Sequence, residues 1–124
     1  MNILIIGAAG GIGSQLLIDL SKNSSHNMLV GYHKKKINTP HESVEIDATK
    51  FEEVENLINK GIEQFGNIDA IINLPGNLIL KPAHLCSEEE FYDWVRCLAA
   101  NGPSGLKITS KLSILKLSPM IFLA

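Results

Sequence analysis

The sequence predicts a single α/β domain, a doubly wound parallel sheet of about four or five strands covered by helices. Three observations support this: unbroken apolar runs of strand length, amphipathic stretches of helix length, and the alternation of the two along the chain. The chain has 124 residues, of which 45% are hydrophobic and 19% charged, and its formal net charge is -2. A chain of this size buries one core but not two, and its composition excludes disordered and fibrous proteins.

The first third of the chain predicts a strand, a helix and two further strands. Residues 3–6 are an unbroken aliphatic run ended by Gly7, which is typical of a strand buried on both faces. A helix should follow, because apolar residues recur there at helical spacing: Ile12, Leu16, Leu17 and Leu20. Residues 28–32 and, more weakly, residues 43–46 predict the next two strands. The segment between them is short for a helical crossover, so we expect a loop there.

The middle of the chain contains the best signalled helix. Thr49, with Glu52 three residues later, has the spacing of a capping box, and Gly66 stands where a C-terminal cap belongs. Between them an apolar stripe is formed by Phe51, Val54, Leu57, Ile58, Ile62 and Phe65. Residues 68–74 then predict a fourth strand, closed by Pro75 and Gly76.

The remaining elements are less regular. A second capping box, Ser87 with Glu90, predicts a helix that runs through Leu98. Residues 106–118 could form a short basic amphipathic helix, which either binds a membrane surface or a partner, or is the next helix of the domain, packed on the sheet or in a subunit contact. Residues 120–123 are either the start of a fifth strand or an uncovered apolar end.

A glycine-rich turn between the first strand and the first helix is the candidate binding site. Gly7, Gly11 and Gly13 allow a tight turn and let a ligand approach the backbone closely. The helix that starts there directs unpaired N–H groups at the turn, so we expect an anion such as a pyrophosphate. A phosphate-binding NTPase loop is excluded, because no lysine appears before Lys22. The alternative is a glycine-rich turn that binds no ligand.

The residues after the second strand bear on the choice of dinucleotide. The position about twenty residues past the glycines holds His33, followed by Lys34 and two further lysines, and no acidic residue lies between Asp19 and Glu42. A carboxylate there would bond the ribose 2′-hydroxyl and repel a 2′-phosphate, so its absence favours NADP(H) over NAD(H). The alternative is a solvated lysine run. Three lysines in an acidic chain make a nucleic-acid partner improbable, and no nucleic acid is expected.

These residues together resemble the short-chain dehydrogenase/reductase family over about residues 1–100. The glycine spacing matches, Asp47-Ala48 is similar to the pair that holds adenine, and residues 73–76 are similar to the family's Asn-Asn-Ala-Gly. Residues 80–83 and 87–94 also resemble the segment that follows in these enzymes. The resemblance implies a Rossmann-like fold, with residues 101–124 as a divergent or truncated tail. It implies these dinucleotide-binding residues: Gly7, Ala8, Ala9, Gly10, Gly11, Ile12, Gly13, His33, Lys34, Asp47, Ala48, Asn73 and Gly76.

The family's catalytic residues have no clear counterpart in this chain. The family uses a tyrosine, a lysine four residues later and a serine, whereas the only tyrosines here are Tyr32 and Tyr92. Tyr32 with Lys36 has the spacing but lies at the end of a strand, and Tyr92 is followed by Arg96 instead of lysine. Asn101 is a candidate for the family's helix asparagine. We therefore expect no catalytic residues in this chain.

The sequence thus predicts a truncated NADP(H)-dependent oxidoreductase for an unknown carbonyl or alcohol substrate, which binds the dinucleotide but lacks catalysis. The alternative is a non-catalytic nucleotide-binding or interaction protein that pairs with a full-length relative. Oligomer contacts, with the same chain or another, are expected through residues 88–118.

Cysteine content and the apolar segments bear on location. Cys86 and Cys97 are too few for a disulfide framework and lack metal-site spacing, so no metal is expected. With no secretory signal and no membrane span in the sequence, we predict a cytoplasmic protein.

Overall fold

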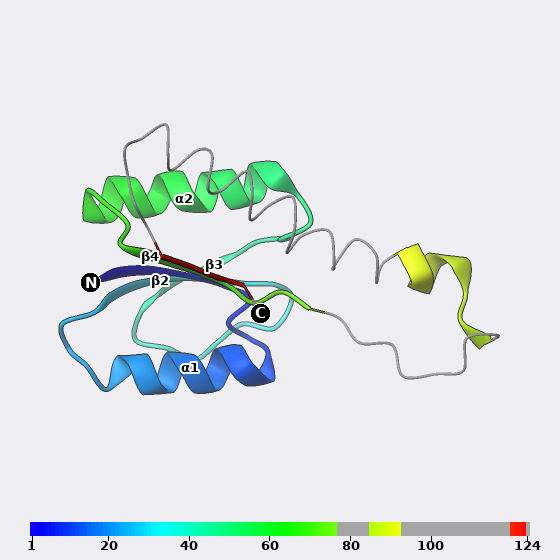
Figure 1. Ribbon diagram of the computed structural model, residues 1–124, viewed down its shortest axis with the longest axis horizontal. Helices are drawn as coiled ribbons and strands as arrows, with labels where there is room; N and C mark the ends of the chain where they lie inside the picture. The colour runs from blue at the N-terminus through cyan, green and yellow to red at the C-terminus, as the bar shows by residue number, and fades with distance from the viewer. Residues whose placement is uncertain (77–84, 93–119, 124) are drawn as a thin grey trace.

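The computed structural model describes residues 1–76, 85–92 and 120–123. Within these ranges, α1 (Gly11–Ser21) and α2 (Phe51–Phe65) cover opposite faces of a sheet (Figure 1). The sheet has five strands in the order β3-β2-β1-β4-β5, and every neighbouring pair is parallel. The strands are β1 (Asn2–Ile6), β2 (Asn27–Tyr32), β3 (Glu42–Glu45), β4 (Ala70–Asn73) and β5 (Met120–Leu123). The predicted α/β fold with an incomplete Rossmann-like sheet is confirmed.

The central strand β1 explains why an unbroken apolar run is needed at the start of the chain. Leu4 pairs with Leu29 on β2 and with Ile71 on β4, so β1 has a strand on each side. Successive side chains point to opposite faces of a strand, and helices cover both faces here. Leu4 therefore joins the core under α2, while Ile5 joins the core under α1, and both are fully buried.

The N-terminus of α2 differs from the predicted capping box. The cap residue is Lys50, one position later than expected, and no side chain caps it. Thr49 lies outside the helix and donates its hydroxyl to Asp47 Oδ1 over 2.6 Å. With the helix shifted by one residue, Glu53 and not Glu52 occupies the third helical position. The Glu53 carboxylate accepts a hydrogen bond from the backbone N–H of Asp47, before the helix. The C-terminal cap at Gly66, with φ of 80°, is as predicted.

The apolar face predicted for α1 is only partly correct. Leu17 is buried, and Leu16 and Leu20 are partly buried against the core. Ile12, however, is 70% exposed. Ile12 is five positions before Leu17, which places it about 140° around the helix from the buried side.

The described residues also contain the loop between β2 and β3, the strand at residues 120–123 and the second capping box. Residues 33–41 contain no helix, so the predicted loop is confirmed, and residues 120–123 form a strand. The second capping box is also present: the Ser87 N–H donates to Glu90 Oε2 over 2.9 Å, and the Glu90 N–H donates to Ser87 Oγ over 3.2 Å. The predicted helix beyond residue 92 and the amphipathic segment 106–118 lie outside the described residues.

Candidate functional site

The carboxyl ends of four parallel strands meet at one pocket of about 260 Å³. Ligands bind at this end of open parallel sheets, because the loops that follow the strands converge there. The segments that follow β1, β2, β3 and β4 all contribute to it. The lining residues are Ile6, Gly7, Ala9, Gly10, Tyr32, His33, Ile46, Asp47, Ala48, Thr49, Leu74, Pro75 and Gly76.

Two glycines of the turn are required by packing within the protein. Gly7 has φ of 82°, and a Cβ there would lie 2.8 Å from the backbone nitrogen of Pro75. A Cβ on Gly13 would lie 2.7 Å from Ala8 Cα and 2.7 Å from Gly7 O. The first turn of α1 therefore packs directly on the backbone of the glycine turn, and a side chain at either position would force these segments apart.

Gly11 differs, because a Cβ there would meet no heavy atom within 4 Å. Packing within the described residues thus gives no reason for glycine at this position. The missing side chain leaves the start of α1 open, and Gly11 is exposed. An approaching ligand could contact the backbone there, which is the role that such a glycine has in dinucleotide sites.

The amides around Gly11 are also without acceptors. Gly10 donates its N–H to Gly7 O over 3.4 Å, and Ser14 donates to Gly10 O over 2.9 Å. The N–H groups between and beside them have no acceptor among the described residues: Ala9, Gly11, Ile12 and Gly13. The first turn of α1 contains no acidic residue. Free amides and the positive end of the helix dipole favour an anion at this place.

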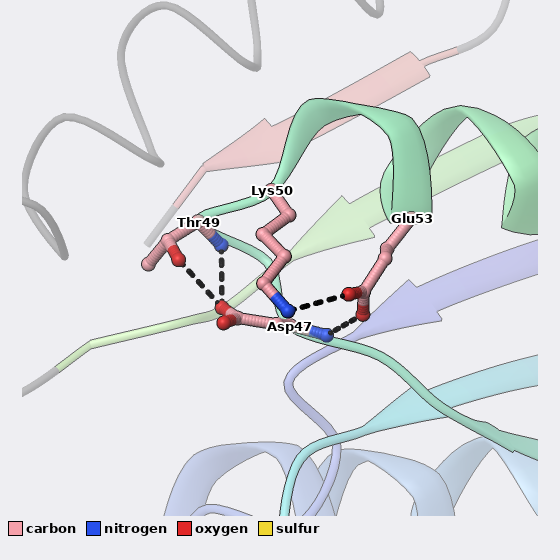
Figure 2. A network of polar contacts seen from close by, with 4 residues as sticks. All are labelled: Asp47, Thr49, Lys50 and Glu53. Atoms are coloured by element: carbon pink, nitrogen blue, oxygen red, sulfur yellow. Dashed lines mark hydrogen bonds and ion pairs between the residues drawn. The ribbon is translucent and has the colours of Figure 1, made fainter.

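A network of polar contacts fixes the segment after β3 (Figure 2). Asp47 Oδ1 accepts hydrogen bonds from the Thr49 N–H at 2.9 Å and from the Thr49 hydroxyl at 2.6 Å. The Asp47 N–H donates to Glu53 Oε2 over 2.6 Å, and Lys50 Nζ lies 3.0 Å from Glu53 Oε1. The Lys50 N–H closes the turn by donating to Asp47 O over 3.0 Å. Asp47 is thus held through its backbone and one carboxylate oxygen.

The same contacts lower the pKa of both carboxylates, so Asp47 and Glu53 are ionised at neutral pH and stay ionised to a lower pH than usual. The hydrogen bond from the Thr49 hydroxyl is the main cause that lowers the pKa of Asp47, against an opposing effect of partial burial. The nearby His33 lowers it further. The pKa of Glu53 is lowered first by the Asp47 N–H and then by Lys50. The pocket therefore contains a charged acceptor at Asp47.

One acceptor and one donor of this segment remain available. Asp47 Oδ2 has no hydrogen-bond partner in the part of the chain that the structure describes, and neither does the adjacent Ala48 N–H. Both residues line the pocket. The segment can therefore accept one hydrogen bond and donate another to the edge of a planar heterocycle.

The structure brings together only part of the predicted binding set. The predicted residues that line the pocket are Gly7, Ala9, Gly10, His33, Asp47, Ala48 and Gly76. Those that do not are Ala8, Gly13 and Asn73, which are buried, and Gly11, Ile12 and Lys34, which are exposed.

Sequence reasoning missed the mostly apolar lining contributed by Ile6, Tyr32, Ile46, Thr49, Leu74 and Pro75. Their position at or just after the carboxyl ends of strands was the signal that could have identified them.

The tyrosines do not form a catalytic pair in the described part of the chain. Tyr32 is 9% exposed and lines the pocket, whereas Lys36 is exposed and makes no hydrogen bond with it. The four-residue spacing between them therefore does not produce a Tyr–Lys pair. Tyr92 is half-exposed, and Arg96 and Asn101 lie outside the described residues.

Residues 1–76, 85–92 and 120–123 contain neither a cluster of metal ligands nor a helix able to span a membrane. No group of three or more His, Cys, Asp or Glu side chains in these ranges is placed to hold a metal ion. No helix in them has the length and apolar character needed to cross a bilayer. Cys86 is a free thiol, and Cys97 lies outside the described residues.

A family comparison decides the relationship of this chain. The family model described as short chain dehydrogenase matches residues 1–113. The chain belongs to the short-chain dehydrogenase family. A curated relative is a hydroxynaphthalene reductase-like protein, Arp2, of Metarhizium acridum, which is 27% identical over 100 residues. That match covers 71% of this chain and 37% of the relative, so the chain spans little more than a third of the relative's length.

Two solved structures show the same fold. The 3-ketoacyl-(acyl-carrier-protein) reductase of Brucella melitensis, complexed with NADH, is 23% identical with a TM-score of 0.71. A Burkholderia cenocepacia protein described as a dehydrogenase, with bound NADP, is 23% identical with a TM-score of 0.63. Each match covers 90% of this chain, but only 48% and 46% of the respective neighbour. The chain thus corresponds to about half of each neighbour.

Proposed function

We propose that this short-chain dehydrogenase chain binds a nicotinamide dinucleotide at the carboxyl end of its sheet, as the nucleotide-binding part of an oxidoreductase for a carbonyl or alcohol substrate. The observation that carries the proposal is the group of free amides at Ala9, Gly11, Ile12 and Gly13, beside a glycine that packing does not require. Family membership supports the same reading.

The residues present fit such a group. The diphosphate would accept hydrogen bonds from the free amides at the start of α1, where the helix dipole also favours negative charge. The adenine would lie on the apolar pocket wall and bond to Asp47 Oδ2 and the Ala48 N–H. Gly76, after the end of β4, lines the pocket and would complete the site on the other side. When bound, the nicotinamide would supply or accept the hydride.

The preferred form in this proposal is NADP(H) over NAD(H). His33 borders the pocket at the end of β2, and the exposed Lys34 follows it. No carboxylate in this segment would repel a 2′-phosphate, since the nearest acidic residues in sequence are Asp19 and Glu42. A basic group near the ribose attracts the 2′-phosphate of NADP(H).

The proposal assigns no catalytic residue within residues 1–124. The only tyrosine in the pocket, Tyr32, lacks a lysine partner among the described residues, so the Tyr–Lys pair that the family uses for proton transfer is not formed there. We therefore expect this chain alone to bind the dinucleotide without enzymatic turnover. Substrate-dependent oxidation of NADPH clearly above a no-protein control would contradict this part.

Thermal unfolding with and without cofactor tests the proposal. A ligand at a hundred times its dissociation constant stabilises the folded state by about 2.7 kcal/mol. The unfolding temperature should rise in NADPH, and rise less in NADH at the same concentration. Equal stabilisation by both would refute the NADP(H) preference, and no stabilisation by either would refute dinucleotide binding.

A further inference from the structure

Glu53 makes a contact that ordinary helix capping does not explain. A glutamate at the third helical position normally accepts a hydrogen bond from the backbone N–H of the cap residue. The cap residue of α2 is Lys50, yet Glu53 Oε2 accepts from the Asp47 N–H, three residues earlier, at 2.6 Å. The carboxylate therefore holds the pocket-lining segment in place instead of closing the end of the helix.

Lys50 supports the contact between Glu53 and the Asp47 N–H by pairing with the second oxygen of the Glu53 carboxylate. Lys50 Nζ lies 3.0 Å from the second oxygen, Glu53 Oε1, and the Asp47 N–H is the largest cause that lowers the pKa of Glu53 (Figure 2). The Glu53 carboxylate thus stays charged and makes a charge-assisted hydrogen bond, which is about twice as strong as a neutral one. Since Thr49 holds one oxygen of Asp47 and Lys50 holds its carbonyl, the Glu53 contact is the one that fixes its N–H.

This arrangement determines what the segment offers to a ligand. With Asp47 held in this way, its Oδ2 remains an acceptor and the next amide, Ala48 N–H, remains a donor. Adenine presents an amine donor beside a ring-nitrogen acceptor, which complements this pair. Hypoxanthine presents a carbonyl oxygen beside a ring N–H, so both of its groups would oppose the pair.

We propose that Glu53 is a positioning residue for base selection: by holding the Asp47 N–H, it sets Asp47 and Ala48 to accept an adenine dinucleotide and disfavour its hypoxanthine analogue. The inference rests on the proposed dinucleotide site. Glu53 acts through Asp47 and does not itself contact the base.

The test measures dissociation constants of NADPH and of its hypoxanthine (deamino) analogue by calorimetry. The 124-residue chain should prefer NADPH by about tenfold or more, because losing a hydrogen bond to a charged group typically lowers affinity by at least that factor. Glu53→Ala should reduce the preference below about threefold. Glu53→Gln keeps an oxygen acceptor for the Asp47 N–H and should retain most of it.

A matched control separates base selection from a general effect of charge on α2. Glu52 is exposed, lies in the same first turn, and its side chain makes no hydrogen bond with another described residue, so Glu52→Ala removes a similar charge without the contact. The Glu52→Ala variant should keep the wild-type preference. A readout without ligand is amide hydrogen exchange, in which the Asp47 N–H should exchange faster in Glu53→Ala than in wild type or Glu53→Gln. Circular dichroism checks that each variant is folded. If Glu53→Ala does not fold, Glu53→Asp replaces it: the charge is kept, but the shorter side chain withdraws the carboxylate from the Asp47 N–H, so the preference should again fall.

The outcomes separate this inference from the function on which it rests. If wild type binds neither dinucleotide, the proposed function fails and the inference fails with it. If wild type binds both forms equally, or if Glu53→Ala keeps the full preference, binding stands and the inference is overturned. An equal loss of preference in Glu52→Ala would also overturn it, by assigning the effect to helix charge.

Discussion

The contact between α1 and the glycine turn gives a direct prediction for Gly13→Ala. The added Cβ would lie 2.7 Å from Ala8 Cα, 2.7 Å from Gly7 O and 3.0 Å from Ala8 C. All three are backbone atoms, which cannot move aside as a flexible side-chain end can. The substitution must therefore push the first turn of α1 away from the turn.

The expected cost is the difference between two effects. Overpacking of this kind costs about 1–3 kcal/mol. Replacing glycine by alanine within a helix returns up to about 1 kcal/mol, because alanine loses less backbone entropy. We therefore expect Gly13→Ala to lower the free energy of unfolding by up to about 2 kcal/mol relative to wild type, and by about 1–3 kcal/mol relative to a helical glycine-to-alanine change without the clash.

Urea denaturation followed by circular dichroism measures this, with Gly11→Ala as the matched control. A Cβ on Gly11 meets nothing within 4 Å, so this variant should be as stable as wild type or slightly more stable. If Gly13→Ala proved as stable as the Gly11→Ala control, the close packing of α1 on the turn would be refuted.

Three further predictions concern the core under α2, the Asp47 carboxylate and the choice of cofactor. Leu57→Ala removes a side chain that is 2% exposed and should cost about 2–5 kcal/mol in urea denaturation, whereas Ile18→Ala, at 57% exposure, should cost less than about 0.5 kcal/mol. Thr49→Val removes the hydroxyl donor to Asp47, so the pKa of that carboxyl should rise toward its ordinary value. Because the native pKa of Asp47 is lowered, its ionised form stabilises the fold above the unfolded pKa and this contribution is lost as pH falls through the native pKa. The wild-type advantage over Thr49→Val should therefore shrink on acidification, and an advantage that is constant with pH would contradict the assignment. His33→Asp should weaken NADPH binding while NADH binding stays the same or improves, as measured by calorimetry; an equal loss for both would contradict the role of His33.

The sheet could be predicted because burial on both faces requires unbroken apolar runs. Residues 3–6 show this pattern, and α2 was predictable for a different reason, because its apolar residues recur at helical spacing over about four turns. The start of α2 could not be predicted to the residue, because Thr49 has two competing uses, as a cap or as a donor to Asp47. The sequence alone does not reveal which acceptor lies closer in space.

Part of the pocket lining could be predicted from the sequence, namely the glycine turn and the segment at Asp47 and Ala48, but the full lining could not. The three glycines look alike in the sequence, yet Gly7 and Gly13 are required by backbone contacts and Gly11 is not. That distinction depends on distances between segments far apart in the chain, such as Gly7 and Pro75. Apolar lining residues such as Ile46 were missed because an apolar residue at a strand end looks like any core residue.

The most direct test of a dinucleotide site follows the backbone amides of an isotopically labelled chain by NMR during addition of NADPH. The free N–H groups of Ala9, Gly11, Ile12 and Gly13 should shift the most and become protected from exchange with water. Saturable binding that left these four amides unchanged, while amides elsewhere shifted, would contradict the account.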